Sequence, residues 1–356
     1  MVVRLPQAAY SIKFKAMMTA AHQASSPSAR EPAPRNLTGN ALSHEVPLLP
    51  ALAVVKTPYF HLLGYSVAGE ETVIQVPELN VVFDIGKCPR PMLTSDFCLL
   101  THGHMDHSAG LAYYLSQRFF QGMTPGTIIC PIGIAEAVTG VIKSWTALEG
   151  KAIAHRVIGL KIGEEYELRK GLIVRTFATR HTVPSAGFLL LDRREKLKPE
   201  LAQQQLPGHI LRDMKARGEK ITYTLDVPLI AYTGDTSMSE TLLQDGVRDA
   251  RVLLTECTFF EPGHCQRAAV GHHLHLQELM EALPKLENEL VLITHLSRRT
   301  YLRWARKTLE KAMAGLIIKP RVEFFMDHAQ KLQVRPGKAA AFTPVEPAAT
   351  TDAEDV

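Results

Sequence analysis

The stretch Thr101-His102-Gly103-His104-Met105-Asp106-His107 places three imidazoles and a carboxylate within six residues. It lies between a run that predicts a strand, Phe97–Thr101, and a run that predicts a helix, Ser108–Phe120. In a tight loop, His102 and His104 can point together at one metal ion, while Asp106 and His107 turn toward a second. Imidazole and carboxylate ligands suit zinc, and suit manganese or iron less selectively. We therefore expect a metal centre here rather than a cluster of surface histidines.

Three more side chains of metal-binding type follow predicted strands elsewhere in the chain. They are His181, Asp235 and His295, and the strands before them are Leu172–Phe177, Leu229–Thr233 and Leu290–Thr294. Loops at one edge of a rigid sheet commonly carry function. The sequence thus predicts that four strands deliver metal ligands to the same edge.

Short apolar runs alternate with helical patterns through the middle of the chain. The strands occur in runs between isolated helices, which predicts an α/β protein with sheets packed on each other and helices outside. The remaining predicted strands are Thr72–Val76, Val81–Asp84, Thr127–Cys130, Gly187–Leu191, Arg251–Thr255 and Arg321–Phe325. The remaining predicted helices are Ile132–Leu148, Met238–Asp245, Leu276–Leu283 and Arg299–Ala312.

Composition narrows the function classes without choosing one. The chain has 356 residues, 46% of them hydrophobic, which suffices for one large core, and a net charge of only +4. That charge does not demand a nucleic-acid partner, although local basic clusters could still bind one. No apolar run approaches the about 20 residues that cross a bilayer, so we expect no membrane partner. The five cysteines lack zinc-knuckle spacing, which indicates a reduced, cytoplasmic type of compartment.

The two ends of the chain differ in composition from its middle. Residues 1–50 are rich in Ala, Ser and Pro, and their first acidic residue is Glu31. We expect a flexible leader there, and its basic, acid-poor start is also typical of an organelle transit peptide. The catalytic domain is expected over residues 51–335 and a disordered tail over residues 336–356.

The motif His-x-His-x-Asp-His after a strand resembles the signature of the metallo-β-lactamase superfamily, and the later motifs follow in that family's order. The fold that this resemblance implies is the αββα sandwich, with metals at one edge of the two sheets. Four further segments resemble the tRNase Z (RNase Z) family in its short, plant-type form. They are residues 83–89, His181-Thr182-Val183-Pro184-Ser185-Ala186-Gly187, Thr255-Glu256-Cys257-Thr258-Phe259 and His295-Leu296-Ser297-Arg298-Arg299.

The resemblance implies two zinc ions per chain, with manganese or a similar ion as a substitute. Its seven implied ligands form two sets around a bridging Asp235: His102, His104 and His181 for one ion, and Asp106, His107 and His295 for the other. Leu296 and Thr300 stand where the family has Phe and Tyr, which affects loop packing or nucleotide stacking rather than metal binding.

The implied reaction is endonucleolytic removal of the 3′ trailer from precursor tRNA. A metal-held hydroxide attacks phosphorus, and the 3′ oxygen of the tRNA leaves as a 3′-hydroxyl. Asp106 would orient the nucleophile and accept its proton, while His273 would protonate the leaving oxygen. Glu256 would orient His273, because a carboxylate behind an imidazole fixes its tautomer. His272 and His275 remain alternatives to His273, and a purely structural ion pair remains the alternative for Glu256.

Between its third and fourth motifs the family carries a substrate-binding arm, which is short here and lies near residues 200–220. Pro207, followed by apolar residues at helical spacing and then Gly218, predicts a short helix. Its cations Arg212, Lys215 and Arg217 would contact tRNA phosphates, which supply affinity without reading sequence. An ordinary solvated helix face is the alternative.

The partners that the resemblance implies are precursor tRNA and a second copy of the chain in a homodimer. The alternative function is that of a metallo-β-lactamase-fold phosphodiesterase or esterase that acts on a small molecule with the same metals. The segments Pro184–Gly187 and Thr255–Phe259 discriminate between the two, because they resemble the tRNA branch.

Overall fold

The computed structural model describes residues 51–237 and 239–330. The chain divides into two units, Met1–Val46 and Pro47–Val356, and every described residue lies in the second. The predicted leader over 1–50 and the predicted tail over 336–356 lie outside the described residues. Within those residues, no helix is long and apolar enough to cross a membrane.

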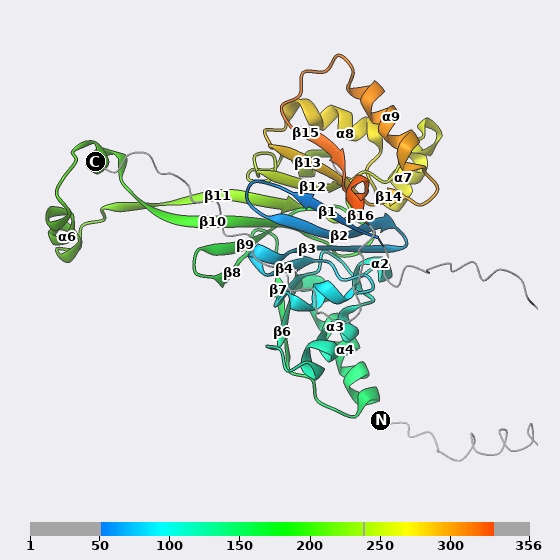
Figure 1. Cartoon of the computed structure of the whole chain (residues 1–356), viewed down its shortest axis with the longest axis horizontal. Helices are drawn as coiled ribbons and strands as arrows, with labels where there is room; N and C mark the ends of the chain where they lie inside the picture. Colours follow the sequence, from blue (N-terminus) through cyan, green and yellow to red (C-terminus); the bar gives the residue numbers. More distant parts are fainter. Residues whose placement is uncertain (1–50, 238, 331–356) are drawn as a thin grey trace, which may run out of the picture. The chain divides into compact units, whose positions relative to one another are not determined.

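Two mixed β-sheets lie face to face, and helices cover the outer face of each (Figure 1). The strand order of the first sheet is β16-β1-β2-β3-β4-β5-β6-β7, and β14 pairs with β2. Its strands are β1 (Leu52–Lys56), β2 (His61–Ala68), β3 (Glu71–Val76), β4 (Val81–Phe83), β5 (Phe97–Leu99), β6 (Gly126–Pro131), β7 (His155–Leu160), β14 (Leu296–Ser297) and β16 (Ala329–Gln330). Strands β4 to β7 are parallel to one another, whereas β1 to β4 are antiparallel.

The second sheet has the order β15-β13-β12-β11-β10-β9-β8. Its strands are β8 (Glu165–Arg169), β9 (Leu172–Phe177), β10 (Gly187–Leu197), β11 (Thr222–Tyr232), β12 (Val252–Glu256), β13 (Leu290–Thr294) and β15 (Arg321–Phe324). Strands β11, β12, β13 and β15 are parallel, so that their carboxyl ends share one edge. Strand β9 is antiparallel to β10, which is antiparallel to β11, so β9 ends at that edge as well.

Helices flank the paired sheets in two groups, which makes the four layers of an αββα sandwich (Figure 1). The α-helices are α2 (Met105–Ser108), α3 (Leu111–Phe120), α4 (Ile132–Glu149), α5 (Pro199–Gln203), α6 (Gly208–Ala216), α7 (Cys265–Gly271), α8 (Leu276–Ala282) and α9 (Leu302–Met313). Short 3-10 helices η1 to η6 lie at Pro77–Leu79, Arg90–Thr94, Ser239–Leu243, Pro262–His264, Leu283–Lys285 and Phe325–His328.

The strand period of two explains how one chain builds three apolar layers. In β13, Leu290 and Leu292 face the other sheet, and Val291 and Ile293 face helices α8 and α9. In β5, Leu99 lies between the sheets, whereas the next residue on either side packs toward α3 and α4. Both sheets are therefore apolar on both faces, and their ends are left to carry polar groups.

Strands β10 and β11 continue beyond the sheet as a two-stranded hairpin that carries α5 and α6, and we call residues 193–226 the arm (Figure 1). The register of the two strands shifts between Leu190 and Leu191, where Leu191 pairs with Pro228. A proline has no N–H to donate, and it is tolerated beside such a bulge. The bulge therefore lies where the hairpin leaves the sheet.

Most of the predicted elements are present, with changed limits. The predicted helix Ser108–Phe120 begins later, as α3, and the short α2 ends at Ser108. The predicted helix Met238–Asp245 is the 3-10 turn η3 in its described part. The predicted strands Gly187–Leu191 and Leu229–Thr233 are the inner ends of the longer β10 and β11. Strands β1, β2, β7, β8, β14 and β16 were not predicted.

Candidate metal centre

All seven side chains that the sequence singled out as metal ligands lie together at one edge of the two sheets. His102, His104, His181 and Asp235 form one group, and Asp106, His107 and His295 form another. Within each group, one nitrogen or oxygen atom per residue lies within 4.8 Å of all the others. The prediction that separate strands bring these residues to the same edge is confirmed.

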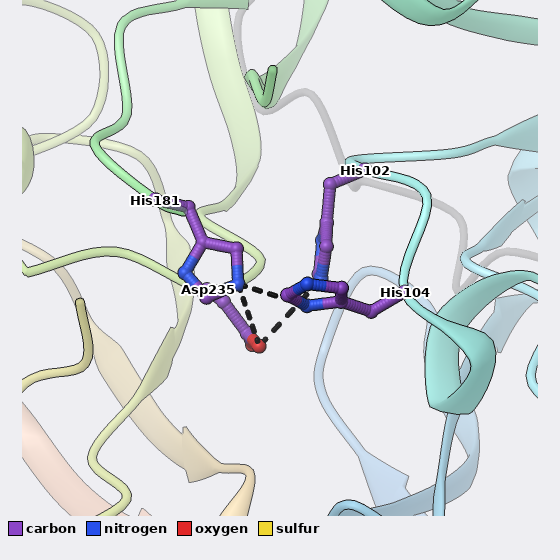
Figure 2. Close-up of side chains that lie close together, drawn as sticks. All are labelled: His102, His104, His181 and Asp235. Carbon is purple, nitrogen blue, oxygen red and sulfur yellow. Dashed lines mark hydrogen bonds and ion pairs between the residues drawn. The ribbon is translucent and has the colours of Figure 1, made fainter. Parts of the chain in front are cut away.

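In the first group, the three histidines surround the carboxylate of Asp235 (Figure 2). The nearest nitrogen atoms of His104 and His181 are 3.0 Å apart. Nε2 of His102 lies 3.7 Å from Oδ2 of Asp235, and Nε2 of His181 lies 3.8 Å from the same oxygen. The four side chains therefore surround one point.

The second group meets the other side of the same carboxylate. Nε2 of His107 and Nε2 of His295 are 3.2 Å apart, and Oδ2 of Asp106 is 3.4 Å from Nε2 of His295. Nε2 of His107 lies 3.5 Å from Oδ2 of Asp235, and Nδ1 of His295 lies 3.4 Å from Oδ1. Asp235 thus touches both groups.

The loop between β5 and α3 sends its histidines in two directions because it contains the single helical turn α2. The backbone N–H of His107 donates to the carbonyl of His104 at 3.0 Å, and the hydroxyl of Ser108 donates to the same carbonyl at 2.9 Å. This turn buries His107 in the second group and leaves His104 in the first.

Several backbone positions at the centre have positive φ, among them His295 and Gly234. His295 has φ 56°, and its N–H donates to the hydroxyl of Ser66 at 2.9 Å. Gly234 has φ 58°, and a Cβ there would lie 2.7 Å from the side chain of Thr101. Only glycine combines that conformation with such a close approach, so Gly234 sets the path of the loop that carries Asp235.

Four of the imidazoles are held through Nδ1, which leaves Nε2 free to face the cluster. Nδ1 of His107 bonds Asp84 at 2.7 Å, and Nδ1 of His181 bonds the carbonyl of His272 at 3.0 Å. Nδ1 of His102 bonds the hydroxyl of Thr101 at 3.0 Å. Nδ1 of His295 bonds the hydroxyl of Thr258 at 3.0 Å. An Nδ1–H held by an oxygen fixes the tautomer in which Nε2 carries a lone pair.

Asp84 is a functional residue that the sequence did not single out. It is fully buried at the end of β4 and bonds His107, while the backbone N–H of Thr101 and the hydroxyl of Tyr232 donate to it at 2.8 and 2.7 Å. Its place in the segment 83–89 was the available signal, but its partners come from both sheets. Asp84 therefore orients His107 from behind.

A second buried carboxylate, Glu256, lies at the carboxyl end of β12. It accepts a hydrogen bond from Nδ1 of His273 at 2.9 Å and one from the hydroxyl of Thr258 at 2.5 Å. Because this hydroxyl donates to Glu256, it is an acceptor for His295. Glu256 thus orients one imidazole directly and another through Thr258, and the sequence did not single out Thr258.

Among the three neighbouring histidines, His273 is the one whose ring enters the cluster. Its Nδ1 lies 3.9 Å from Asp235, and its ring stacks on that of His295 with centroids 5.3 Å apart. The ring of His275 instead caps α8, where Nδ1 accepts from the N–H of Gln277. His272 contributes its backbone carbonyl.

Burial and charge act in opposite directions at the centre. Burial lowers the pKa of His102 well below its usual value, and the neighbouring His107 lowers it further. Burial also lowers the pKa of His107, but the carboxylates of Asp235 and Asp84 outweigh it and raise that pKa well above the usual value. Burial lowers the pKa of His273 too, yet Glu256 raises it to about 9. The pKa is therefore raised for the imidazoles that lie beside carboxylates, His107 and His273, and lowered for His102.

The residues present fit a bound cation. Nε2 of His102 and Oδ1 of Asp235 are buried without a hydrogen-bond partner among the described residues. Such atoms cost free energy unless another group satisfies them. The facing Nε2 atoms of His107 and His295 both carry lone pairs when their Nδ1 atoms are protonated, and they would repel without a cation. Imidazole nitrogens and carboxylate oxygens in this number are typical zinc ligands.

The predicted substrate-binding cations lie apart from the centre, in the arm. Arg212 and Lys215 are exposed on α6, and Arg217 follows the helix and pairs with Glu219 at 2.8 Å. The predicted helix before Gly218 is confirmed, but none of its residues is buried.

The two departures from the family pattern leave the centre intact. Leu296 packs in the core beside α8 and α9, and the hydroxyl of Thr300 donates to Glu261 at 2.9 Å. Within the described residues, no hydrogen bond joins the side chain of Thr300 to any of the seven ligands. The loop after His295 therefore keeps its packing without the aromatic residues of the family.

Comparison with known proteins identifies the family. Residues 87–296 match the Beta-lactamase superfamily domain. The chain is 35% identical over 257 residues to tRNase Z TRZ1 of Arabidopsis thaliana, a match that spans 71% of this chain and 89% of the relative. It is 36% identical over 272 residues to tRNase Z TRZ2, chloroplastic, of the same organism, over 74% and 75% of the two chains.

A solved structure supports the fold. The metallo-beta-lactamase fold protein YhfI from Bacillus subtilis has a TM-score of 0.51 at 14% identity, over 77% of this chain and 95% of that one. At such low identity the likeness concerns the fold alone, and it agrees with the αββα layers described above. By the superfamily domain and the two plant relatives together, this chain belongs to the tRNase Z family of the metallo-β-lactamase superfamily.

Proposed function

We propose that this chain is a metal-dependent endoribonuclease that removes the 3′ trailer of precursor tRNA and leaves a 3′-hydroxyl on the tRNA. The observation that carries the proposal is the convergence of oriented imidazoles on Asp235, in a chain of the tRNase Z family. The curated relatives are named for this activity, and the chain covers 89% and 75% of their lengths.

Two divalent cations per chain would be held by the two groups, and zinc is the cation that we propose, with manganese as a substitute. His102, His104 and His181 would hold one cation, and Asp106, His107 and His295 the other, with Asp235 shared by both. When bound, the cations would supply Lewis acidity toward the scissile phosphate and a lower pKa for the attacking water.

Asp106 would orient the attacking water and accept its proton. Its Oδ2 accepts the backbone N–H of Gly69 at 2.7 Å and contacts His295. Burial raises the pKa of this carboxyl, but the hydrogen bond from His295 and the charge of His107 outweigh it and hold the pKa below its usual value. The carboxylate form needed for accepting a proton is therefore the stable one.

His273 would protonate the 3′ oxygen that leaves. Its Nδ1 is held by Glu256, and its side chain is 18% exposed, so that the ring reaches the edge of the cluster. Glu256, with no exposed surface, would act as a positioning residue for this ring. The 3′ oxygen is a poor leaving group as an alkoxide. A positioned imidazole that donates a proton to it would therefore speed its departure.

The arm would bind the body of the tRNA through phosphates. Arg212 and Lys215 form no ion pair within residues 51–237 and 239–330, and Arg217 pairs only with the exposed Glu219 of the arm itself. Cations that are not neutralised by the fold remain free to contact a polyanion. Contacts of this kind would supply affinity and register.

We further propose that the chain acts as a homodimer, as its family resemblance implies. Helix α4 and the end of α3 present exposed apolar side chains to solvent: Phe120, Val141, Trp145 and Leu148. An exposed apolar patch of this kind marks a contact surface, and a second copy of this chain is the partner that the resemblance supplies. Sedimentation of wild type against Trp145→Glu tests this surface, and a wild-type monomer would contradict it.

The experiment that tests the function compares two substrates. Purified protein with zinc is given a 3′-extended precursor tRNA and, separately, bis(p-nitrophenyl) phosphate. We expect kcat/KM to be far higher for the RNA, with one cut at the junction of tRNA and trailer. Efficient hydrolysis of the small diester with no cut in the RNA would instead favour a small-molecule phosphodiesterase or esterase.

A further inference from the structure

A pocket of about 420 Å³, with both polar and apolar lining, lies beside the metal centre. Its walls include Arg180, Ser237 and His272, which stand one, two and one residues from His181, Asp235 and His273 respectively. The backbone binds these walls together, since the N–H of Ser237 donates to the carbonyl of Arg180 at 2.9 Å. The pocket therefore shares its walls with the loops that carry the cluster.

The volume and the lining both suit one nucleotide. Small-molecule sites commonly have about 300–1,000 Å³, and a nucleotide fits the lower part of that range. Gln277 contributes an exposed amide, which can both donate to and accept from a base edge. Ser237 contributes a hydroxyl.

Arg180 supplies the charge that a nucleotide needs. It is exposed, and its guanidinium forms no ion pair with any residue of the described part of the chain, although Glu278 lines the same pocket. Its backbone is fixed, because its N–H donates to the hydroxyl of Thr236 at 3.1 Å. An unpaired guanidinium on a fixed backbone matches the fork geometry of phosphate recognition.

The imidazole of His272 adds a further polar group. Its Nδ1 is shielded from solvent and has no hydrogen-bond partner within residues 51–237 and 239–330. A buried polar atom without a partner costs free energy. A ligand that lets the ring of His272 turn and form a hydrogen bond would therefore be stabilised in the pocket. Backbone strain accompanies this ring, since His272 has φ 52°.

We propose that this pocket holds the nucleotide that flanks the scissile phosphate, with Arg180 on its phosphate and Gln277 on its base. The proposal rests on the proposed function and deepens it, because it assigns residues that select RNA next to the cut. A substrate without a flanking nucleotide, such as bis(p-nitrophenyl) phosphate, gains nothing from the pocket.

Cys265 gives the pocket a direct reporter. It lines the pocket and is exposed, whereas the other four cysteines, Cys88, Cys98, Cys130 and Cys257, are buried. Burial also raises the pKa of those four thiols, which slows their alkylation. The rate at which iodoacetamide modifies the protein therefore reports on Cys265.

The test measures that rate in an Asp235→Asn background, in which we expect turnover to be blocked, and RNA binding by this variant is measured first. Saturating precursor tRNA should slow alkylation of Cys265 at least about tenfold. Mature tRNA and a trailer oligonucleotide with a 5′-phosphate are tested separately, and protection by one of them tells which side of the cut fills the pocket. An unchanged rate with all three RNAs, each shown to bind, would overturn the proposal.

Kinetic measurements on single variants of the wild-type protein provide a second test. Arg180→Ala should lower kcat/KM for precursor tRNA about 10- to 100-fold, the range of a lost hydrogen bond to a charged group. The diester should change less than about twofold, and so should precursor tRNA with the matched control Arg156→Ala, an exposed arginine on β7. Arg180→Lys should recover part of the loss.

Equal losses on RNA and diester would mean that Arg180 only supports His181, and would overturn the proposal. Equal RNA cleavage by the Arg180→Ala and Arg156→Ala variants would overturn it too. Either result leaves the proposed function standing if the wild type cuts precursor tRNA. Failure of the wild type to cut precursor tRNA would remove both.

Discussion

The metal centre and the arm hold their functional side chains in opposite ways. At the centre, each oriented imidazole has an oxygen partner behind it, and the carboxylates Asp84 and Glu256 are fully buried. In the arm, no residue of α5 or α6 is buried, and beyond Arg193 strand β10 pairs only with β11.

A network of ion pairs holds the base of the arm against the second sheet. Arg193 pairs with Asp226 and with Glu165 at 2.7 and 2.9 Å, and Arg175 contacts the same two carboxylates. Single exposed pairs contribute little, but four residues in a network fix the direction of the hairpin better than one pair does.

The difference fits the function proposed for each region. Hydrolysis of a phosphodiester needs reacting groups held within fractions of an ångström, which requires buried partners. Phosphate contacts need charge of the right sign near a polyanion, and they tolerate movement. Changes at the centre should therefore affect every substrate, and changes in the arm should affect only RNA.

The largest effect is expected from Asp235→Ala, because this one carboxylate touches both groups. Turnover of precursor tRNA and of the diester should both fall by at least about 10⁴-fold, since two Lewis acids lose their shared ligand. Elemental analysis of the purified variant should give fewer than the about two zinc-class ions per chain expected for wild type. Full activity of wild type in chelator, with no bound metal, would contradict the account of the centre.

The second largest effect is expected from His273, the residue proposed to protonate the leaving 3′ oxygen. His273→Ala should lower kcat for precursor tRNA about 10²- to 10³-fold, which is within the usual contribution of a general acid. Bound metal should stay unchanged, and the diester should be nearly unaffected, because p-nitrophenolate leaves without a proton. His264→Ala, at a histidine that pairs with Glu261 outside the cluster, serves as the control. Equal losses on both substrates would assign His273 to metal binding instead.

A smaller effect is expected from Asp84, which orients a candidate ligand without being one itself. Asp84→Asn keeps the shape of the side chain but removes the charge that orients His107, and it should weaken metal affinity about 10- to 100-fold. Metal titration measures the affinity, and a thermal melt of the metal-free protein separates it from loss of folding. Tyr232→Phe, which removes only one hydrogen bond to Asp84, should have a milder effect. Unchanged affinity in Asp84→Asn would show that His107 needs no partner behind it.

The smallest effect is expected from the arm and should appear on RNA alone. Neutralising Arg212, Lys215 and Arg217 together should raise KM for precursor tRNA and flatten its salt dependence by up to about three phosphates. Diester hydrolysis should not change. Glu219→Gln frees Arg217 from its ion pair and should shift the salt dependence the other way. If tRNA kinetics in the triple variant match wild type, α6 is an ordinary solvated helix.

The ligands could be predicted from the sequence because they lie in short segments that follow apolar strands. The run Leu290–Thr294, for example, ends next to His295, and parallel strands bring such ends to one edge. The partners behind them could not be predicted in the same way. Asp84 meets Tyr232 across the two sheets, a contact between residues 148 positions apart, and no local pattern marks it.

Among the missed strands, β1 and β2 do carry buried apolar residues, whereas the edge strand β8 lacks the apolar pattern for a physical reason. Strand β8 is the edge of its sheet and reads Glu-Tyr-Glu-Leu-Arg, with only Leu168 buried. Strand β7 is also an edge, and Arg156 is exposed on it. In the outer part of β10, the residues Asp192-Arg193-Arg194-Glu195-Lys196 are held by pairing with β11 rather than by burial. Strands without a core face leave little hydrophobic signal.

The terminal groups of the two cleavage products test most directly the claim that water attacks phosphorus at the junction of tRNA and trailer. A 3′-extended precursor tRNA is cut by the purified, zinc-loaded protein, and both products are mapped to the nucleotide and analysed for their terminal groups. Attack of water at phosphorus, with departure of the 3′ oxygen, predicts a tRNA with a 3′-hydroxyl and a trailer with a 5′-phosphate. A 2′,3′-cyclic phosphate on the tRNA, or cuts away from the junction with the trailer, would contradict the account.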